Sequence, residues 1–399
     1  MRVAPSRRFR ALSAALLLGL GACSEGFEDV EMHLGLEGKT RPLAILCEPP
    51  EAAPGDTVRV SLYLHSPDPA SCAVAWRVAL DYDLGPYGAD EIERHLLPLS
   101  PPPPVDEALG FLRQDFVFVV PDSALLFASS LRDPLEDPGT IALAEALLPA
   151  GTPSPPPKAA VDAYLAGLDP AELAALPPAS QAAALALADR FACRLRFRAA
   201  ISSERYVEVT RTLTVRHSAR LGSPNANRNP GYSQYMVLAI PHPDVAFADR
   251  LRYESELQVF AFPATPEAGA IAVPARANWT YYLTLTPELQ FYTSPLGDAG
   301  ELLERSTLRW YYFAVDAPTD AFPLFRDDAG DPAEMWALDE NVRLVPPTSG
   351  EHRYRLVCCL RDSRPEWDHY GGTPGLTLAL GELVFTPPTG AAPSAGGGD

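Results

Sequence analysis

The chain lacks the motifs that mark most enzyme classes. It has no GxSxG, no HExxH, no phosphate-binding glycine loop and no Rossmann fingerprint, and its seven histidines include no pair at metal-ligand spacing. Lysine occurs only at Lys39 and Lys158, and acidic residues outnumber basic residues by 51 to 32. The resulting net charge of −19 disfavours binding to nucleic acid or to anionic lipid. These absences favour a non-catalytic protein.

Apolar runs long enough to span a membrane are also absent, and the one segment that resembles such a run lies at the N-terminus. Arginines are frequent in residues 1–10, and the apolar run from Ala11 to Leu20 follows them. A helix of about ten residues spans roughly 15 Å, whereas a bilayer core is about 30 Å thick. The run therefore fits a signal peptide and not a spanning helix. It closes with Leu20-Gly21-Ala22-Cys23, which resembles the lipobox of bacterial lipoproteins.

This resemblance implies that residues 1–22 are a signal peptide and that Cys23 is acylated. Loss of residues 1–22 removes arginines and no acidic residue, so the mature chain is more acidic still. Two or more acyl chains hold a protein on a membrane, whereas one chain does so only marginally. Ser24 follows the cysteine, which favours the outer membrane under the enteric sorting rule. We therefore expect a lipid-anchored protein of the bacterial cell envelope, on an acidic tether of residues 23–40. The alternative is an ordinary signal peptide with a chance cysteine.

Cysteine is scarce elsewhere. The remaining cysteines are Cys47, Cys72, Cys193, Cys358 and Cys359. Their number is odd, so at least one thiol stays unpaired or pairs between chains, and no spacing resembles a zinc site. The expected compartment permits disulfides, and Cys193 has either Cys47 or Cys72 as a possible partner.

Alternating apolar and polar residues predict β-strands in residues 41–217. Val58 to Leu64 alternates in this way, and so does Cys193 to Ala199, with arginines at the outward positions. The strand order and an inward Trp76 on the third strand predict an immunoglobulin-like sandwich. Alanine- and leucine-rich segments at about 123–190 predict an α-helical insertion. Its leucines are expected to form a local core, the alternative being a partner-binding groove.

Residues 251–386 repeat this pattern. Trp310 occupies the corresponding strand, and a later strand places Tyr354 and Cys358 inward and Val357 outward. The predicted fold class is therefore mainly β, with two tandem immunoglobulin-like β-sandwiches, the first carrying the helical insertion. Residues 218–250 are expected to be a linker and lead-in. Its asparagines suit turns, and a calcium site is the alternative. Residues 387–399 are expected to be a flexible tail.

Short motifs support a family resemblance. Residues 41–58, RPLAILCEPPEAAPGDTV, resemble the opening of a group of lipoproteins of Gram-negative bacteria with tandem immunoglobulin-like domains. Asn227-Arg228-Asn229-Pro230 matches the Asn-x-Asn-Pro linker of that group. Arg361-Asp362-Ser363-Arg364-Pro365 departs from its Arg-Asp-Gly-Arg-Gly-Gly turn. The resemblance implies a fold and a location, and it implies no activity.

One predicted binding site is an aromatic loop near the C-terminus, because loops at the end of a sandwich commonly bind partners. Its candidate residues are Asp362, Glu366, Trp367, Asp368, His369 and Tyr370. The alternative is that Trp367 and Tyr370 fold back onto the protein and plug it.

Two acidic clusters are weaker candidates for a functional site. One cluster surrounds a glycine and suits Ca²⁺, with a solvated acidic loop as the alternative; its residues are Asp327, Asp328, Asp331 and Glu334. The carboxylates of Asp81 and Asp83 suit acid–base work, with a capped strand end as the alternative. No organic cofactor is expected.

The expected function follows from the anchor and from the absent motifs. We expect a membrane-anchored, non-catalytic envelope lipoprotein that serves binding or assembly, with an envelope protein or glycan as its partner and no nucleic acid. The alternatives are a hydrolase acting on envelope polymers and a purely structural spacer.

Overall fold

The computed structural model describes most of the chain beyond residue 39. The described residues are 40–80, 97–98, 106–108, 111–126, 133–204, 206–263, 269–295, 300–315, 324–325, 341–347, 349–370 and 372–387. Cys23, the tether, the acidic clusters at Asp81 and Asp327 and the tail from residue 388 lie outside these residues. Among the residues described, no helix combines the length and the apolarity needed to cross a bilayer. The fold is mainly β, as expected.

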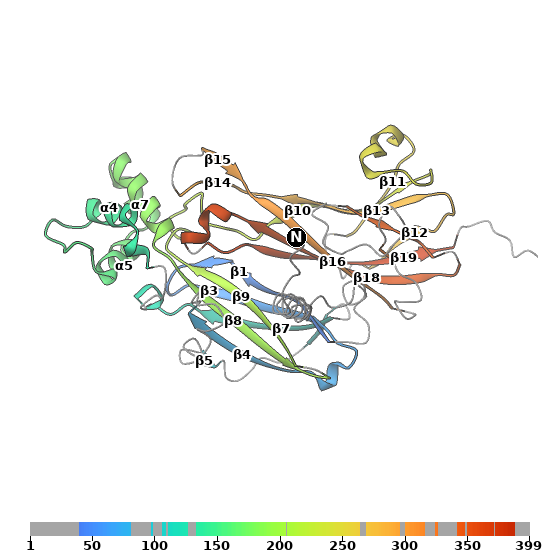
Figure 1. Ribbon diagram of the computed structural model, residues 1–399, viewed down its shortest axis with the longest axis horizontal. Helices are drawn as coiled ribbons and strands as arrows, with labels where there is room; N and C mark the ends of the chain where they lie inside the picture. Colours follow the sequence, from blue (N-terminus) through green and yellow to red (C-terminus); the bar gives the residue numbers. More distant parts are fainter. Residues whose placement is uncertain are drawn as a thin grey trace, which may run out of the picture.

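Two sheets form the first sheet pair (Figure 1). One sheet has the order β1 (Arg41–Glu48), β3 (Thr57–His65), β7 (Phe111–Val119) and β6 (Asp106–Ala108). The other has the order β2 (Glu51–Ala52), β9 (Tyr206–Val215), β8 (Cys193–Ser202), β4 (Ala73–Leu80) and β5 (Leu97–Pro98). Neighbouring strands in both sheets are antiparallel, except β2 and β9, which are parallel.

The core of the first sheet pair follows the predicted alternation. In β8, Leu195, Phe197 and Ala199 are buried, whereas the arginines between them are partly exposed. Trp76 faces this core, as predicted, and its indole N–H donates to Gln114 Oε1 at 2.5 Å. A buried tryptophan with a satisfied N–H contributes a large apolar area without an orphaned donor.

The predicted helical insertion is present at one end of the sheets (left in Figure 1). It comprises α4 (Pro138–Leu147), α5 (Lys158–Ala166), α6 (Pro170–Ala175) and α7 (Pro178–Arg190). Asp169 and Glu172 form a capping box at the start of α6, with proline at the first helical position. Buried apolar residues of the helices, such as Val161, Leu165 and Leu187, belong to the same cluster as the sheet core. Short 3-10 turns lie at η1 (Pro69–Ser71), η3 (Ala124–Leu126) and η4 (Pro134–Glu136).

A second sheet pair follows. One sheet has the order β11 (Gln258–Ala261), β10 (Gly231–Ile240), β13 (Thr280–Glu288) and β17 (Asn341–Leu344). The other has the order β12 (Ile271–Pro274), β19 (Leu376–Thr386), β18 (His352–Ser363) and β16 (Arg305–Ala314). A hairpin of β14 (Phe291–Thr293) and β15 (Glu301–Leu303) extends beside them. Trp310 is fully buried in the shared core, as predicted.

The second sheet pair begins earlier in the chain than predicted. β10 lies inside residues 218–250, which were predicted to be linker and lead-in, and it pairs with both β11 and β13. The 3-10 helix η5 (Phe247–Tyr253) then covers the outer face of this sheet, where Leu238 and Tyr282 are buried. The true connection between the sheet pairs is therefore only the segment 216–230.

The two sheet pairs stack on each other, so that four sheets form successive layers (Figure 1). The contact is an apolar cluster that joins β1, β3 and β7 to β16 and β18. Its buried members are Leu43, Ala44, Leu46, Tyr63, Phe111, Phe313, Val357 and Cys359. Val357 faces away from the core of its own sandwich, as predicted, but the first sheet pair covers that face and leaves Val357 0% exposed.

The cysteines remain thiols. Cys47, Cys72, Cys193, Cys358 and Cys359 are all free. A bridge from Cys193 to Cys47 or Cys72, considered above, is therefore wrong: the Cys193 thiol instead donates to the carbonyl of Ala124 at 3.4 Å. Burial raises the pKa of Cys47 and Cys193 to about 12, so neither thiol is activated as a nucleophile.

Candidate functional site at the junction of the two sheet pairs

The connecting segment 216–230 ties the two sheet pairs together through asparagine side chains. The Asn225 side chain donates to Asp189 Oδ2 at 2.8 Å and accepts from the backbone N–H of Thr293 at 2.9 Å. Asn229 donates to the carbonyl of Cys47 at 2.8 Å and accepts from the N–H of Leu376 at 3.0 Å. Each asparagine therefore contacts both sheet pairs. Side-chain-to-backbone bonding was predicted here, although its inter-unit role was not.

Glu51 and Arg216 form an ion pair at the start of this segment. Arg216 Nε lies 2.9 Å from Glu51 Oε2, and Nη2 lies 2.6 Å from Oε1, with both side chains 1% exposed. The remaining guanidinium donors reach the carbonyls of Asp189 and Asn225 at 2.8 and 3.0 Å. A buried charge costs several kcal/mol unless it is paired and hydrogen-bonded, and this pair meets both conditions.

A second buried ion pair lies on the other side. Arg364 Nε donates to Glu304 Oε1 at 2.6 Å, and Nη1 donates to the carbonyl of Asn225 at 2.7 Å. Glu304 Oε2 also accepts the N–H of Gln290 at 2.7 Å. The carbonyl of Asn225 thus receives a guanidinium from each sheet pair, Arg216 from the first and Arg364 from the second.

Asp362, a predicted binding residue, is fully buried at this junction. Its Oδ1 accepts the N–H of Gly375 at 2.6 Å and the Asn227 amide at 3.4 Å, and its Oδ2 has no hydrogen-bond partner among the described residues. Burial raises the pKa of Asp362 to about 6, and the negative charge of Glu304 acts in the same direction. Hydrogen bonds from Gly375 and Asn227 oppose this shift.

The predicted aromatic loop forms the 3-10 helix η8 (Pro365–Tyr370). The expectation of an exposed aromatic loop is wrong at Trp367, which is 2% exposed. Its indole N–H donates to the carbonyl of Thr293 at 2.9 Å, and the Arg216 guanidinium lies 5.2 Å from its ring centroid. Trp367 therefore plugs the junction, which is the alternative stated above.

The other loop residues surround this plug. Tyr370 is partly exposed and packs edge-on against Trp367 with 5.9 Å between centroids. Glu366 Oε2 accepts the phenolic O–H of Tyr292 at 2.5 Å. Asp368 and His369 lie in η8, and the structure does not describe their side chains. The loop thus brings Asp362, Trp367 and Tyr370 to one junction, with Glu366 at its margin.

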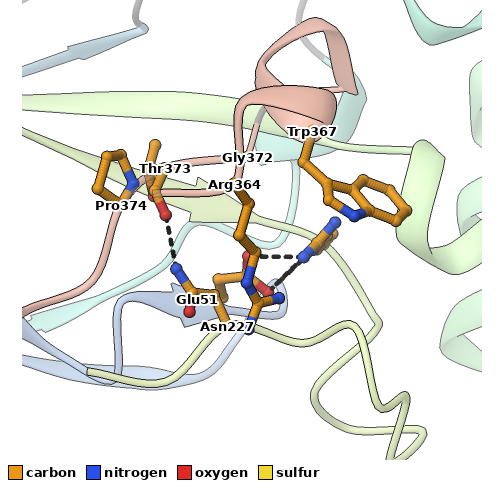
Figure 2. Close-up of a pocket in the computed structure, with 8 residues that line it drawn as sticks. Glu51, Asn227, Arg364, Trp367, Gly372, Thr373 and Pro374 are labelled. Carbon is orange, nitrogen blue, oxygen red and sulfur yellow. Dashed lines mark hydrogen bonds and ion pairs between the residues drawn. The ribbon is translucent and has the colours of Figure 1, made fainter. Parts of the chain in front are cut away.

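A small cavity remains at the centre of the junction (Figure 2). Its walls include Glu51, Arg216, Asn227, Arg364 and Trp367, and its volume is about 10 Å³. A space of this size holds about one water molecule. Figure 2 shows the Asn227 amide directed at Thr373, whose carbonyl it reaches at 2.8 Å. The carboxylates here are engaged by guanidinium groups and amides, so the arrangement fastens two units together and leaves no room for a substrate.

The remaining predicted site residues have no structural test. The candidate Ca²⁺ ligands Asp327, Asp328, Asp331 and Glu334 and the lipidation residue Cys23 lie outside the described residues. Within the described ranges, no group of three or more histidine, cysteine, aspartate or glutamate side chains is placed to hold a metal ion.

No protein-family model matches the chain, and no curated protein matches it either. The resemblance to envelope lipoproteins therefore remains a prediction that rests on the sequence motifs alone.

Sequence reasoning missed the ion-pair partners at the junction. Glu51 and Arg216 are separated by 165 positions, and no periodic pattern connects them. One signal was available: the linker asparagines and the Arg361–Pro365 segment were both recognised as motifs, and the structure brings them into contact at Asn227 and Asp362.

Proposed function

We propose that this protein is a non-catalytic lipoprotein of the bacterial cell envelope, anchored through Cys23, in which two immunoglobulin-like sandwiches act as one rigid binding body. The observation that carries the proposal is the junction, where an apolar cluster and the side-chain hydrogen bonds of Asn225 and Asn229 join the two units, with a buried ion pair of each unit beside them. An interface of this kind between two units of one chain opposes relative domain motion.

The strand order supports the immunoglobulin-like part of the proposal. If β1, β3, β7 and β6 are taken as strands A, B, E and D, their order is that of one immunoglobulin sheet, and β4, β8 and β9 then match strands C, F and G. Trp76 falls on the strand equivalent to C, where that fold carries its core tryptophan. In the second unit, Trp310 on β16 has the same position relative to β18 and β19.

Rigidity has a functional consequence for an anchored protein. A tether of residues 23–40 reaches at most roughly 60 Å when fully extended, so the first sandwich stays close to the membrane. If the second sandwich is fixed to the first, every exposed surface has a defined orientation relative to its neighbours. Binding then requires no ordering of the two units, which lowers its entropic cost.

The anchor is tested by replacing its one essential thiol. In a bacterial host that processes lipoproteins, the full chain should partition into membranes and incorporate a labelled fatty acid. The Cys23→Ala variant should do neither, whereas the Cys72→Ala variant should behave as the wild type. Unchanged membrane partitioning and labelling of Cys23→Ala would refute the anchored part of the proposal.

The binding role is tested by isolating partners. Purified envelopes are crosslinked and captured with the full chain, and a specific protein or glycan should be recovered. Recovery of no partner, together with a turnover activity on envelope polymers, would favour the hydrolase alternative. Recovery of no partner and no activity would favour a structural spacer.

A further inference from the structure

The first sheet pair has an open edge along the second half of β7. β6 pairs only with Phe111 to Arg113 of β7, and no other described strand pairs with β7 on that side. If β6 continued in the same antiparallel register, the residues opposite Asp115 to Phe118 would be Pro101 to Pro104. Proline has no N–H with which to bond β7, so the sequence disfavours such a continuation. Among the described residues, β7 is therefore unpaired on this side from Gln114 to Val119.

The backbone of β7 alternates between β3 and this open edge. The N–H of Val120, just after β7, donates to the carbonyl of Asp56 beside β3 at 2.9 Å. The register between β3 and β7 continues without a shift, so every second residue before Val120 also bonds β3. The intervening residues direct their N–H and C=O groups away from β3. The residues that face the open edge in this way are Asp115, Val117 and Val119.

The side chains along the edge are apolar at one end. Val117 is 65% exposed and Val119 is 60% exposed, and they share one face of the sheet because they alternate along the strand. Edge strands are usually protected from pairing by charged residues, proline or bulges. Asp115 supplies a charge at the other end, where it binds Arg59 at 2.8 Å and Arg113 at 2.7 Å. The half of the edge at the two valines therefore offers both backbone groups and apolar surface to an added strand.

Charge distinguishes between possible added strands. The ends of the edge are acidic in sequence, because β6 begins with Asp106 and Glu107 and the exposed Asp122 follows Val119. The whole chain has a net charge of −19. Like charges brought together at an interface are unfavourable, so a second copy of this chain or an acidic segment is disfavoured. A basic segment is favoured.

We propose that the open edge of β7 binds an extended peptide segment of a partner protein, which adds a strand to the sheet beside Val117 and Val119. Main-chain hydrogen bonds to the three edge-facing residues supply the affinity. Alternate apolar side chains of the peptide pack beside the two valines, and basic residues at its ends meet the acidic ends of the edge. The proposal deepens the proposed function and rests on it only for the envelope location of the partner.

The first test is amide hydrogen exchange, followed residue by residue by nuclear magnetic resonance. It uses residues 24–399 in solution, which contain every described element, so that the outcome does not depend on the anchor. The probe is a short synthetic peptide of alternating valine and threonine with two lysines at each end. The N–H groups of Val117 and Val119 should exchange rapidly in the free protein, and saturating peptide should slow them about tenfold or more. Unchanged exchange at both residues would overturn the proposal.

The second test compares proline substitutions on two edge strands by fluorescence anisotropy of the labelled peptide. Val117→Pro removes an N–H that faces the edge and none that bonds β3, so it should weaken binding about tenfold or more. Val259→Pro is the matched control. Val259 is a 53% exposed residue of the edge strand β11, and it also faces away from its neighbour, because the N–H of Phe262 bonds the carbonyl of Tyr235 in β10. This control should leave affinity within about twofold. Equal affinities of Val117→Pro and the wild type would refute binding at β7, and the exchange experiment decides the matter if Val117→Pro does not fold.

The identity of the occupant is tested separately. The same peptide with glutamates in place of its lysines should bind about fivefold or more weakly, and equal affinity would overturn the basic character of the partner. Sedimentation of residues 24–399 should show a monomer. A dimer that is lost in Val117→Pro would assign the edge to a second copy of this chain and overturn the proposal. Absence of peptide binding, with recovery of a specific glycan from envelopes by the full chain, would overturn this site and leave the proposed function standing.

Discussion

Cys358 and Cys359 are consecutive in β18, yet they belong to two different hydrophobic clusters. Cys358 is 0% exposed inside the second sheet pair, whereas Cys359 is 7% exposed between the two sheet pairs. Successive side chains of a strand point to opposite faces, so β18 is buried on both. This strand is therefore a core element of the second unit and also the surface on which the first unit packs.

Truncation of the interface should destabilise both units together. Phe313 contacts Phe111 across the interface, with 5.3 Å between ring centroids, and it is 6% exposed. Phe313→Ala should lower the free energy of unfolding by about 3–5 kcal/mol in chemical denaturation, because it leaves a cavity. Val119→Ala removes an apolar side chain that is 60% exposed, and we expect less than about 0.5 kcal/mol. A loss of under about 1 kcal/mol for Phe313→Ala would show that the interface is loosely packed.

The buried Glu51–Arg216 pair should be sensitive to loss of one charge. Glu51→Gln leaves the guanidinium buried without its counter-charge, and such breaks cost about 3–5 kcal/mol. A matched control is Asp244→Asn. This variant removes the carboxylate of the Asp244–Arg343 ion pair, in which the Asp244 side chain is 83% exposed. That surface pair should contribute at most about 1 kcal/mol. Equal effects of the two variants on urea midpoints would contradict the assigned burial.

Asp362 should make stability fall as pH rises. The pKa of Asp362 is about 6 in the folded protein, above its ordinary value of 3.8. Between these values the folded state binds more protons than the unfolded state, so the contribution is fully present below about pH 4. It is lost as pH rises through 6, and its size is roughly 3 kcal/mol. Glu304 and Arg364 also act on the pKa of this carboxyl, Glu304 raising it and Arg364 lowering it.

The Asp362→Asn variant tests this dependence. Asparagine retains an acceptor for the N–H of Gly375 but does not titrate, so the slope of stability between pH 4 and 6 should flatten relative to the wild type. The free energy of unfolding is measured by urea denaturation at each pH. An identical slope in the variant and the wild type would assign the pH dependence to other groups.

Gly375 should not tolerate a methyl group. A Cβ there would lie 2.3 Å from Asp362 Oδ2 and 2.7 Å from the carbonyl of Arg228. Gly375→Ala should therefore cost about 1–3 kcal/mol or more, because the backbone of the connecting segment has to move. Gly167→Ala is the control, since its Cβ would meet two helix carbonyls at 3.3 and 3.6 Å and its φ is −78°. If Gly375→Ala proves as stable as the control, the close packing of the connecting segment against Gly375, which precedes β19, is wrong.

Much of the fold could be predicted because a strand with one buried face and one exposed face alternates apolar and polar residues along its sequence. The alternating segments Val58 to Leu64 and Cys193 to Ala199 were predicted as strands, and they lie within β3 and β8. β10 was missed for a physical reason. Val237 and Ala239 face the second core, while Leu238 and Ile240 are buried beneath η5, so the strand has no polar face to reveal a period of two.

The junction was less predictable than the fold. The aromatic residues of η8 were recognised as important, but sequence alone left open whether Trp367 was exposed or plugged the protein. That choice depends on Thr293 and Arg216, which contact Trp367 from distant parts of the chain. Side-chain contacts between distant segments follow from the packed arrangement of the sheets and leave no local signal in the sequence.

The most direct test of the central proposal is the distance between the two sheet pairs in solution. Spin labels are attached to Val119→Cys in the first and Val259→Cys in the second, both exposed positions, in residues 24–399 with Cys72→Ser. Pulsed electron paramagnetic resonance should give one narrow distance distribution, unchanged by addition of a glycan. A broad or bimodal distribution would contradict the account, because it would mean that the two units move independently.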